Sequence, residues 1–394
     1  MVNGLKEIHR GAILSELLRR RPVSRRDIAL GTGISPATVS RVIEQLIAEG
    51  IVREERELRV ETRGRRAVLL DVVAERSHVV GVDLGATNTR IVLADLSGRP
   101  LVATRFPTRR DAPAGELADW LAHEIRTTAR AVWPSVASVC IGVPGAVRTS
   151  GGQISNAPNL SQVEEPVFLS RLRDRLGKPL LLDNDANYAL LGELHFGAAH
   201  QATTAAMLTI GTGLGVGLAI DRQVLRGEHG LVGEFGQLPV GPFGARLEHM
   251  VTGPGILRRA REAGVDLADP ADLFLLDPPP QVAHLRAQFD QAMLIVLTAA
   301  TVSCEPQLII LGGRVGQALI ADTDRYRQGL LATLRVAPEI SGATLGDFSG
   351  AAGAVVDGLQ RAYHELGVAA DSLGDLPAAG ALSLTATEAV MSGR

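Results

Sequence analysis

The chain contains few cysteines and few aromatic residues. Its two cysteines, Cys140 and Cys304, are too few for a disulfide framework or for a structural zinc site built from cysteines. Eight Phe, two Trp and three Tyr among 394 residues make aromatic stacking a poor basis for the main binding chemistry. No apolar run reaches the length of a membrane span, and the N-terminus lacks the apolar core of a signal peptide. We therefore expect a cytoplasmic protein.

The composition is that of an ordinary globular protein of two or three domains. Hydrophobic residues make up 46% of the chain and charged residues 21%, which excludes a mainly disordered chain. The net charge of −3 is unevenly distributed. Residues 1–75 hold 14 basic and 11 acidic side chains, a net of +3, so the remaining residues carry a net of −6. A basic head on an acidic body favours a polyanion as partner of the head.

The pattern of residues 1–75 predicts a winged helix-turn-helix domain. An apolar stripe predicts a helix over residues 6–20. Ser24 and Asp27 resemble a capping box at the start of a second, short helix. After a glycine-containing turn, Ser35 caps a third helix that ends at Gly50. An alternating hairpin with a cationic tip follows. In this motif the last helix enters the major groove of DNA and the hairpin forms the wing.

The residues expected to contact DNA fall into two groups. The start of the third helix presents small polar side chains to base edges, and the tip of the hairpin offers arginines to phosphates or to a narrow minor groove. They are Ser35, Ala37, Thr38, Ser40 and Arg41 in the helix, and Arg63, Arg65 and Arg66 in the wing. The alternative is a small helical bundle that binds protein, with a solvated charged hairpin.

From residue 76 onward strands and helices alternate, which predicts an α/β body with mixed sheets over residues 76–368. Two strand turns in it are similar: 83–87 (DLGAT) and 211–215 (GTGLG) each join apolar strands through small residues and a threonine. Facing each other, such turns bind phosphates through backbone N–H groups and hydroxyls, and Asp83 suits a magnesium ion held through water. Alternatively, the glycines serve only the two hairpins. Residues 369–394 show little periodicity and are predicted to form a mobile tail.

Together these segments resemble the ROK family of repressors, open reading frames and sugar kinases, over roughly residues 5–365. The resemblance implies a two-lobed, actin-like and hexokinase-like ATPase fold with a cleft between the lobes. Residues 83–87 resemble the first phosphate motif and residues 209–220 (TIGTGLGVGLAI) the second, while residues 308–316 (LIILGGRVG) resemble the segment near the adenosine. Residues 183–187 (DNDAN) resemble the sugar-site elbow, and residues 229–241 (HGLVGEFGQLPVG) the family signature.

The resemblance implies site residues one by one. Asn184, Asp185, Glu234 and Glu248 match sugar-binding positions, Asp185 is the catalytic base if the protein is a kinase, and carboxylates suit a polyol because each accepts hydrogen bonds from hydroxyls. The implied sugar-binding set is Asn159, Asn184, Asp185, Glu234, Gln237 and Glu248. The implied nucleotide-binding set, if that site is retained, is Asp83, Gly85, Thr87, Gly211, Thr212, Gly213 and Gly313.

The sequence departs from the family at two places. The signature normally continues into a zinc-binding His and three cysteines, whereas this chain has Gln237 at the His position and no cysteine in the following segment, so no zinc is expected. Ala86 stands where the kinases usually carry a second glycine. No cofactor is required by this interpretation, and binding of MgATP stays open.

Three functions follow from these patterns. The first is a transcriptional repressor of sugar metabolism, a homodimer or dimer of dimers, that binds a palindromic double-stranded DNA operator and responds to a sugar or sugar derivative in the cleft. The second is an ATP-dependent sugar kinase with an attached DNA-binding head. The third is a regulator whose cleft is inactive and which a protein partner controls.

Overall fold

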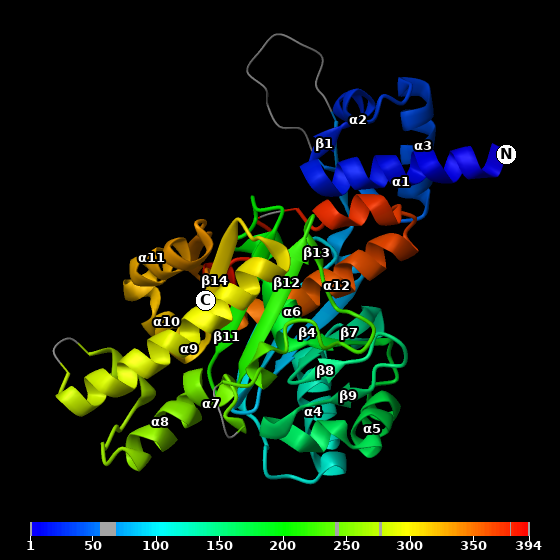
Figure 1. Cartoon of the computed structure of the whole chain (residues 1–394). Helices are drawn as coiled ribbons and strands as arrows, with labels where there is room; N and C mark the ends of the chain where they lie inside the picture. The colour runs from blue at the N-terminus through cyan, green and yellow to red at the C-terminus, as the bar shows by residue number, and fades with distance from the viewer. Residues whose placement is uncertain (1, 56–67, 241–243, 276–277, 379, 393–394) are drawn as a thin grey trace.

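The computed structural model describes residues 2–55, 68–240, 244–275, 278–378 and 380–392. The described residues up to Val72 form the predicted head, which stands at one end of the body (Figure 1). Its elements are α1 (Val2–Arg20), β1 (Val23–Ser24), α2 (Arg25–Thr32), α3 (Pro36–Ala48), β2 (Val52–Glu55) and β3 (Leu69–Val72). The strands pair antiparallel in the order β1-β3-β2. This is the predicted winged helix-turn-helix arrangement, although the wing tip with Arg63, Arg65 and Arg66 lies outside the described residues.

The predicted caps fix the helices of the head. The Ser24 hydroxyl accepts a hydrogen bond from the backbone N–H of Asp27, and Ser35 does the same for Thr38. Gly33 ends α2 with a φ of 68°, a conformation that favours glycine. The apolar side of α3, which includes Val39 and Ile43, is buried in the head.

The first lobe of the body is built on a five-stranded sheet in the order β10-β7-β4-β5-β6. Helices α4 (Ala114–Thr128) and α5 (Pro166–Leu176) cover one face, and α12 (Ser349–Glu365) lies on the other. The strands are β4 (His78–Leu84), β5 (Asn88–Asp95), β6 (Pro100–Pro107), β7 (Val136–Val143) and β10 (Leu180–Asn184), and a separate ribbon pairs β8 (Ala146–Val147) with β9 (Ile154–Ser155).

The second lobe has a sheet in the order β13-β12-β11-β14-β15. Its strands are β11 (Ala205–Ile210), β12 (Leu214–Ile220), β13 (Gln223–Val224), β14 (Leu308–Gly312) and β15 (Glu339–Gly342). Its helices are α7 (Glu248–Val251), α8 (Gly253–Glu262), α9 (Pro280–Cys304), α10 (Gly313–Ala318) and α11 (Thr323–Leu334). Helix α9 is long and apolar enough to cross a membrane by length and composition alone. It is a core helix here, because Met293, Val296 and Ala300 are buried against the sheet.

Helix α6 (Asp185–Phe196) and helix α12 pack together between the two sheets. Glu193, fully buried on α6, holds the entry to α12: its carboxylate accepts hydrogen bonds from the backbone N–H of Leu345 and the hydroxyl of Ser349, among others. These contacts satisfy a buried charge that would otherwise be costly. The chain crosses between the lobes at these two helices, which makes them the connection between the lobes.

The predicted mobile tail over residues 369–394 is wrong for its described part. After a short 3₁₀ helix (Ala370–Asp375), Leu376 and Leu382 are buried, and α13 (Leu384–Met391) packs against β6. The apolar residues of this segment lack helical or strand periodicity, which is why the sequence pattern did not show that they are buried.

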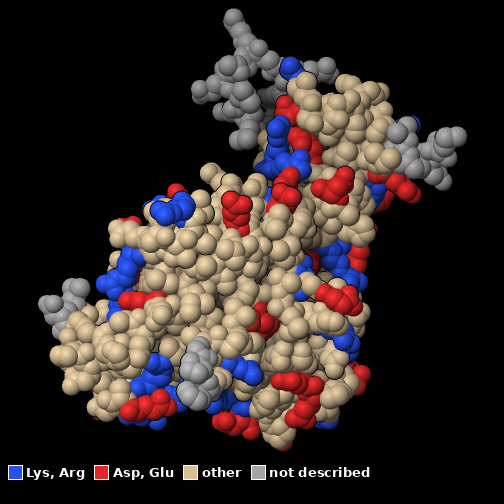
Figure 2. Space-filling view, viewed as in Figure 1, with Lys and Arg blue, Asp and Glu red and all other residues tan. Residues whose placement is uncertain are grey.

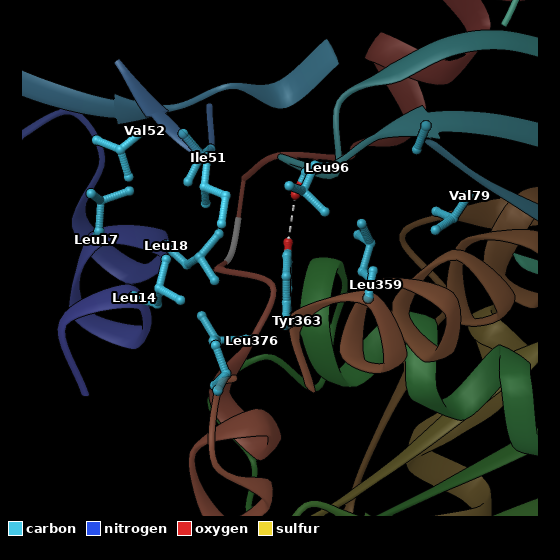
Figure 3. Packing of buried hydrophobic residues seen from close by; sticks show 14 of the residues in the cluster. Leu14, Leu17, Leu18, Ile51, Val52, Val79, Leu96, Leu359, Tyr363 and Leu376 are labelled. Carbon is cyan, nitrogen blue, oxygen red and sulfur yellow. Dashed lines mark hydrogen bonds between the residues drawn. The ribbon is translucent and has the colours of Figure 1, made fainter. Parts of the chain in front are cut away.

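The C-terminal segment shares one hydrophobic core with the head and the first lobe (Figure 3). Leu14 and Leu17 of α1 belong to the same cluster as Leu359 of α12 and Leu376 of the tail. The hydroxyl of Tyr363 donates a hydrogen bond to the backbone oxygen of Leu96 at 2.8 Å. The head is therefore packed onto the body rather than joined to it by a bare linker.

Candidate functional site

A cleft of about 880 Å³ lies between the two lobes. It is lined by both glycine-containing turns, by the start of α6 and by the segment that follows β13. Every residue of the implied sugar-binding and nucleotide-binding sets lines it: Asp83, Gly85, Thr87, Asn159, Asn184, Asp185, Gly211, Thr212, Gly213, Glu234, Gln237, Glu248 and Gly313. The structure thus brings together in one cleft residues that are up to 230 positions apart in the chain.

The elbow between β10 and α6 positions Asn184 and Asp185. The Asn184 side-chain oxygen caps α6 by accepting hydrogen bonds from the N–H groups of Ala186 and Asn187, and its amide donates to the carbonyl of Gly145 at 2.9 Å. Asp185, the first residue of α6, accepts a hydrogen bond from the N–H of Ala186 at 2.8 Å. These contacts fix the backbone of the elbow and leave Asp185 lining the cleft.

Burial raises the pKa of three carboxyl groups of the cleft, Asp83 among them, and two of the three, Asp185 and Glu234, reach about 7. Burial, with the nearby charge of Asp83, raises the pKa of Asp185 to about 7. Burial and the charge of Glu248 raise the pKa of Glu234 to about 7. Near neutral pH both groups therefore exchange between a hydrogen-bond donor and an acceptor, which suits recognition of hydroxyls and places Asp185 in the range of a general base.

Asn159 and Glu248 meet across the cleft. The Asn159 amide donates to a carboxylate oxygen of Glu248 at 3.4 Å, and both side chains lie next to Gly213. A side chain at position 213 would contact these groups, so a small residue there keeps them accessible. Glu248 begins α7 and Asn159 lies in the 3₁₀ segment Pro158–Glu164, so the pair joins elements of the two lobes.

The two glycine-containing turns face each other. The hydroxyls of Thr87 and Thr212 lie 3.3 Å apart, in the position that the sequence pattern predicted for a pair of phosphate-binding turns. Gly313 has a φ of 73° and lies against the backbone of Ile210, where a side chain would collide.

The N-terminal half of α3 presents the predicted DNA contacts to solvent. Ser35, Ala37 and Arg41 are exposed, while Thr38 and Ser40 are partly exposed. The Ser35 hydroxyl accepts the capping hydrogen bond from the backbone N–H of Thr38 and donates a hydrogen bond to the Thr38 hydroxyl. On the face drawn in Figure 2, cationic and anionic side chains are interspersed over head and body, so that face has no single-sign patch.

Sequence comparison decides the family. The profile of the ROK family matches residues 79–357, and a winged helix-turn-helix DNA-binding profile matches residues 7–53. The chain belongs to the ROK family. Its two-lobed fold and its winged helix-turn-helix head are those predicted from the sequence.

Individual relatives and structures agree with this assignment. The chain is 31% identical to a putative xylose repressor of a Caldicellulosiruptor species over 60% of this chain and 59% of that protein, so it spans about three fifths of that relative's length. A ROK family transcriptional regulator described as a homologue of the Escherichia coli Mlc protein superposes with a TM-score of 0.73 at 21% identity, covering 94% of this chain and 99% of the other. A ROK hexokinase from Thermus thermophilus gives a TM-score of 0.58 at 30% identity, over 71% of this chain and 96% of that one.

The zinc site of the ROK signature does not fit the residues present. Gln237 stands at the position of the metal-binding His and contacts the guanidinium of Arg246. The backbone N–H of Leu247 donates to the carbonyl of Leu238 at 3.0 Å, so the described ends of this loop are held by a short hydrogen-bonded pairing. Nowhere in the described part of the chain do three or more His, Cys, Asp or Glu gather in a way that suits a metal ion. Side-chain and backbone contacts hold the loop ends that carry Glu234 and Glu248.

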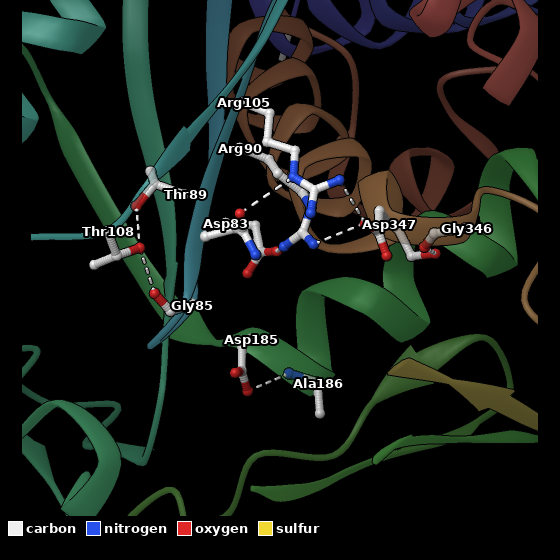
Figure 4. A network of polar contacts seen from close by, with 12 residues as sticks. Asp83, Gly85, Thr89, Arg90, Arg105, Thr108, Asp185, Ala186, Gly346 and Asp347 are labelled. Atoms are coloured by element: carbon white, nitrogen blue, oxygen red, sulfur yellow. Dashed lines mark hydrogen bonds and ion pairs between the residues drawn. The ribbon is translucent and has the colours of Figure 1, made fainter. Parts of the chain in front are cut away.

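The sequence patterns did not reveal a row of charged side chains in the same cleft, formed by Asp83, Arg90, Arg105 and Asp347 (Figure 4). Arg90 lies 3.1 Å from Asp83 and 3.0 Å from Asp347, and Arg105 lies 3.3 Å from the same oxygen of Asp347. The signal was present in strand β5: Arg90 shares a strand face with the buried Val92, where alternation predicts an apolar residue. Asp347 could not be found this way, because it comes from the turn before α12, more than 240 residues away.

Proposed function

We propose that this protein is a transcriptional repressor whose affinity for its DNA operator depends on a sugar or sugar derivative bound in the interlobe cleft. The observation that carries the proposal is the combination of an exposed recognition helix with a cleft that gathers Asn184, Asp185, Glu234 and Glu248. The similarity to a putative xylose repressor, matched over three fifths of its length, supports the same conclusion.

The chemistry of the cleft favours a polyol. Carboxylates and amides from both lobes converge on it, and each carboxylate accepts hydrogen bonds from two hydroxyls. Because Asn159 comes from the first lobe and Glu248 from the second, a ligand bound between them favours the closed arrangement of the lobes. A ligand that contacts both lobes has the differential affinity that a switch requires.

The shared core supplies a route from the cleft to the head. The start of α12, at Ser349 and Gly350, lines the cleft, and its other end lies about 25 Å away along 17 residues. There Tyr363 belongs to the core that includes α1, and the side chain of Arg10 donates to the carbonyl of Leu366. A shift of α12 relative to the second lobe would therefore carry the head with it.

We further propose that the protein acts in the cytoplasm as a homodimer or a dimer of dimers on a palindromic operator. Two heads related by a two-fold axis read two half-sites related by the same axis. Movement of each head with its own lobe changes the spacing of the two recognition helices, and that spacing decides whether both half-sites are bound.

Binding of DNA by the head is tested with two arginine substitutions. Operator sequences are selected from a random duplex library with the full chain, and affinities are then measured by gel shift at several salt concentrations. Arg41→Ala, on the exposed start of α3, should change which sequences are bound. Arg65→Ala should weaken all sequences alike and reduce the salt slope by about one. Unchanged affinity for both variants would contradict the assignment of the head.

A sugar kinase is the second candidate, favoured by the position of Asp185 in the cleft and its raised pKa. Release of ADP from MgATP in the presence of a sugar panel tests it. Turnover that Asp185→Asn abolishes, with DNA binding kept, would establish the kinase. If sugars that stabilise the protein against heat give no release of ADP, the kinase is excluded and the repressor remains as the proposed function.

A further inference from the structure

The sheet register places two arginines in one row of the first lobe. Asp83 on β4 pairs with Arg90 on β5, and Arg90 pairs with Arg105 on β6. Like charges directly opposite each other on neighbouring strands are destabilising. Asp83 offsets one of the two positive charges, and it is mostly buried beside Arg90. The second positive charge, on the half-exposed Arg105, also has an anion as partner.

In this structure that anion is Asp347. One of its oxygens lies 3.0 Å from Arg90 and 3.3 Å from Arg105, although the Asp347 side chain itself is 46% exposed. Both arginines line the cleft together with Thr87 and Thr212. The Arg90 Nε is buried and has no hydrogen-bond partner among the described residues. Arg105 also donates to the side-chain oxygen of Asn88 at 3.2 Å. The two guanidinium groups together carry more N–H donors than Asp83, Asp347 and Asn88 accept.

We propose that Arg90 and Arg105 form a magnesium-independent site for the phosphate group of a phosphorylated ligand, which displaces Asp347. A phosphate offers three oxygens, enough to engage both guanidinium groups and the hydroxyls of the facing turns, whereas a carboxylate offers two. The proposal rests on the proposed function, because it assigns a phosphate subsite to the same ligand cleft.

The same geometry disagrees with a magnesium nucleotide, which the fold of the ROK family implies. Asp83, the carboxylate that would hold the metal through water, is already paired with Arg90 at 3.1 Å. A guanidinium beside a divalent cation repels it. Arg90 supplies positive charge at the phosphate-binding turns without a metal, so phosphate binding there should survive chelation.

Displacement of Asp347 would also reach the connection between the lobes. Asp347 lies two residues before α12, the helix whose other end packs against the head. A ligand phosphate that takes over the arginines releases this end of α12 from β5 and β6. Occupation of the subsite is therefore coupled to the helix that we propose as the route to the head.

Inorganic phosphate in EDTA is the first probe, with binding measured by calorimetry on the full chain. Arg105→Gln should weaken phosphate about tenfold, the loss expected for one charge-assisted hydrogen bond. Asp347→Asn should tighten phosphate, because it removes the competing charge. Arg130→Gln, an exposed arginine outside the cleft, is the matched control and should change nothing. Arg90→Gln is less informative, because it leaves the buried Asp83 unpaired.

The source of the phosphate is tested with sugar phosphates against their parent sugars, and with ATP with and without Mg²⁺. A sugar phosphate that binds more tightly than its parent sugar in EDTA, with the advantage lost in Arg105→Gln, supports the site. Binding of ATP only with Mg²⁺, no binding of phosphate, or equal binding by wild type, Arg105→Gln and Asp347→Asn would overturn it. If a parent sugar changes operator affinity and its phosphate has no advantage, the subsite is wrong and the proposed function stands. If phosphate binds through Arg105 but no ligand alters operator affinity, the subsite stands and the sensing role fails.

Discussion

Asp185 should make the folded protein less stable at alkaline pH. Its pKa is raised from 3.8 to about 7 by burial and by the charge of Asp83, so the folded state disfavours the ionised carboxylate. A group with a raised pKa contributes stability that is fully present below pH 3.8 and is lost as the pH rises through 7. At 1.36 kcal/mol per pH unit, ionisation of Asp185 costs on the order of 4 kcal/mol above pH 7.

Asp185→Asn removes this cost while keeping the size of the side chain and an oxygen for the N–H of Ala186. The variant should therefore equal the wild type in stability near pH 4 and exceed it by on the order of 2–4 kcal/mol at pH 8. Urea unfolding from pH 4 to 8.5 measures the difference, with Asp174→Asn on the exposed face of α5 as the matched control. A difference between Asp185→Asn and wild type that does not vary with pH would refute the burial of a neutral carboxyl in the cleft.

Three further predictions concern the scaffold and the site. Glu193→Gln should destabilise the protein by about 3 kcal/mol or more in urea unfolding, because the amide nitrogen of Gln cannot accept the hydrogen bonds that the buried carboxylate receives; a loss below 1 kcal/mol would contradict this. Leu376→Ala should lower the free energy of unfolding by about 2–5 kcal/mol, because Leu376 is fully buried in the core shared by head and tail. Proteolysis should then cleave the head more readily. An unchanged cleavage pattern would contradict the inference that the tail holds the head against the body. Prolonged dialysis against a chelator should leave the thermal midpoint unchanged, since Gln237 and Arg246 hold the loop that zinc holds elsewhere in the family; a fall that added zinc reverses would contradict the metal-free loop.

The elements that sequence could predict are those specified by local patterns. Caps at Ser24 and Ser35, the glycines at the turns and the alternation in β4 to β6 are read within windows of ten residues, and the structure confirms the elements they predict. The resemblance to the ROK family added the pairing of distant segments, which periodicity alone does not supply. The implied residues do line one cleft, although their roles in binding stay predictions.

The features that sequence could not predict depend on contacts between distant residues. The tail looked unstructured because Leu376 and Leu382, which are buried in the core that also includes α1 and α12, stand singly in the sequence and show no period. Arg90 was visible as a charge on a buried strand face, but its meaning depends on Arg105 one strand away and on Asp347 before α12. Such charge rows emerge only when the register of the sheet is known.

A ligand in the cleft should change the affinity of the head for DNA. The most direct measurement is a titration of the selected operator with the full chain, in the presence of each sugar and sugar phosphate of a panel. We predict that one ligand changes the operator dissociation constant by about tenfold or more, and that Glu234→Ala and Glu248→Ala lose this response. An operator affinity that no ligand alters, or a response that both variants keep, would contradict coupling between the cleft and the head.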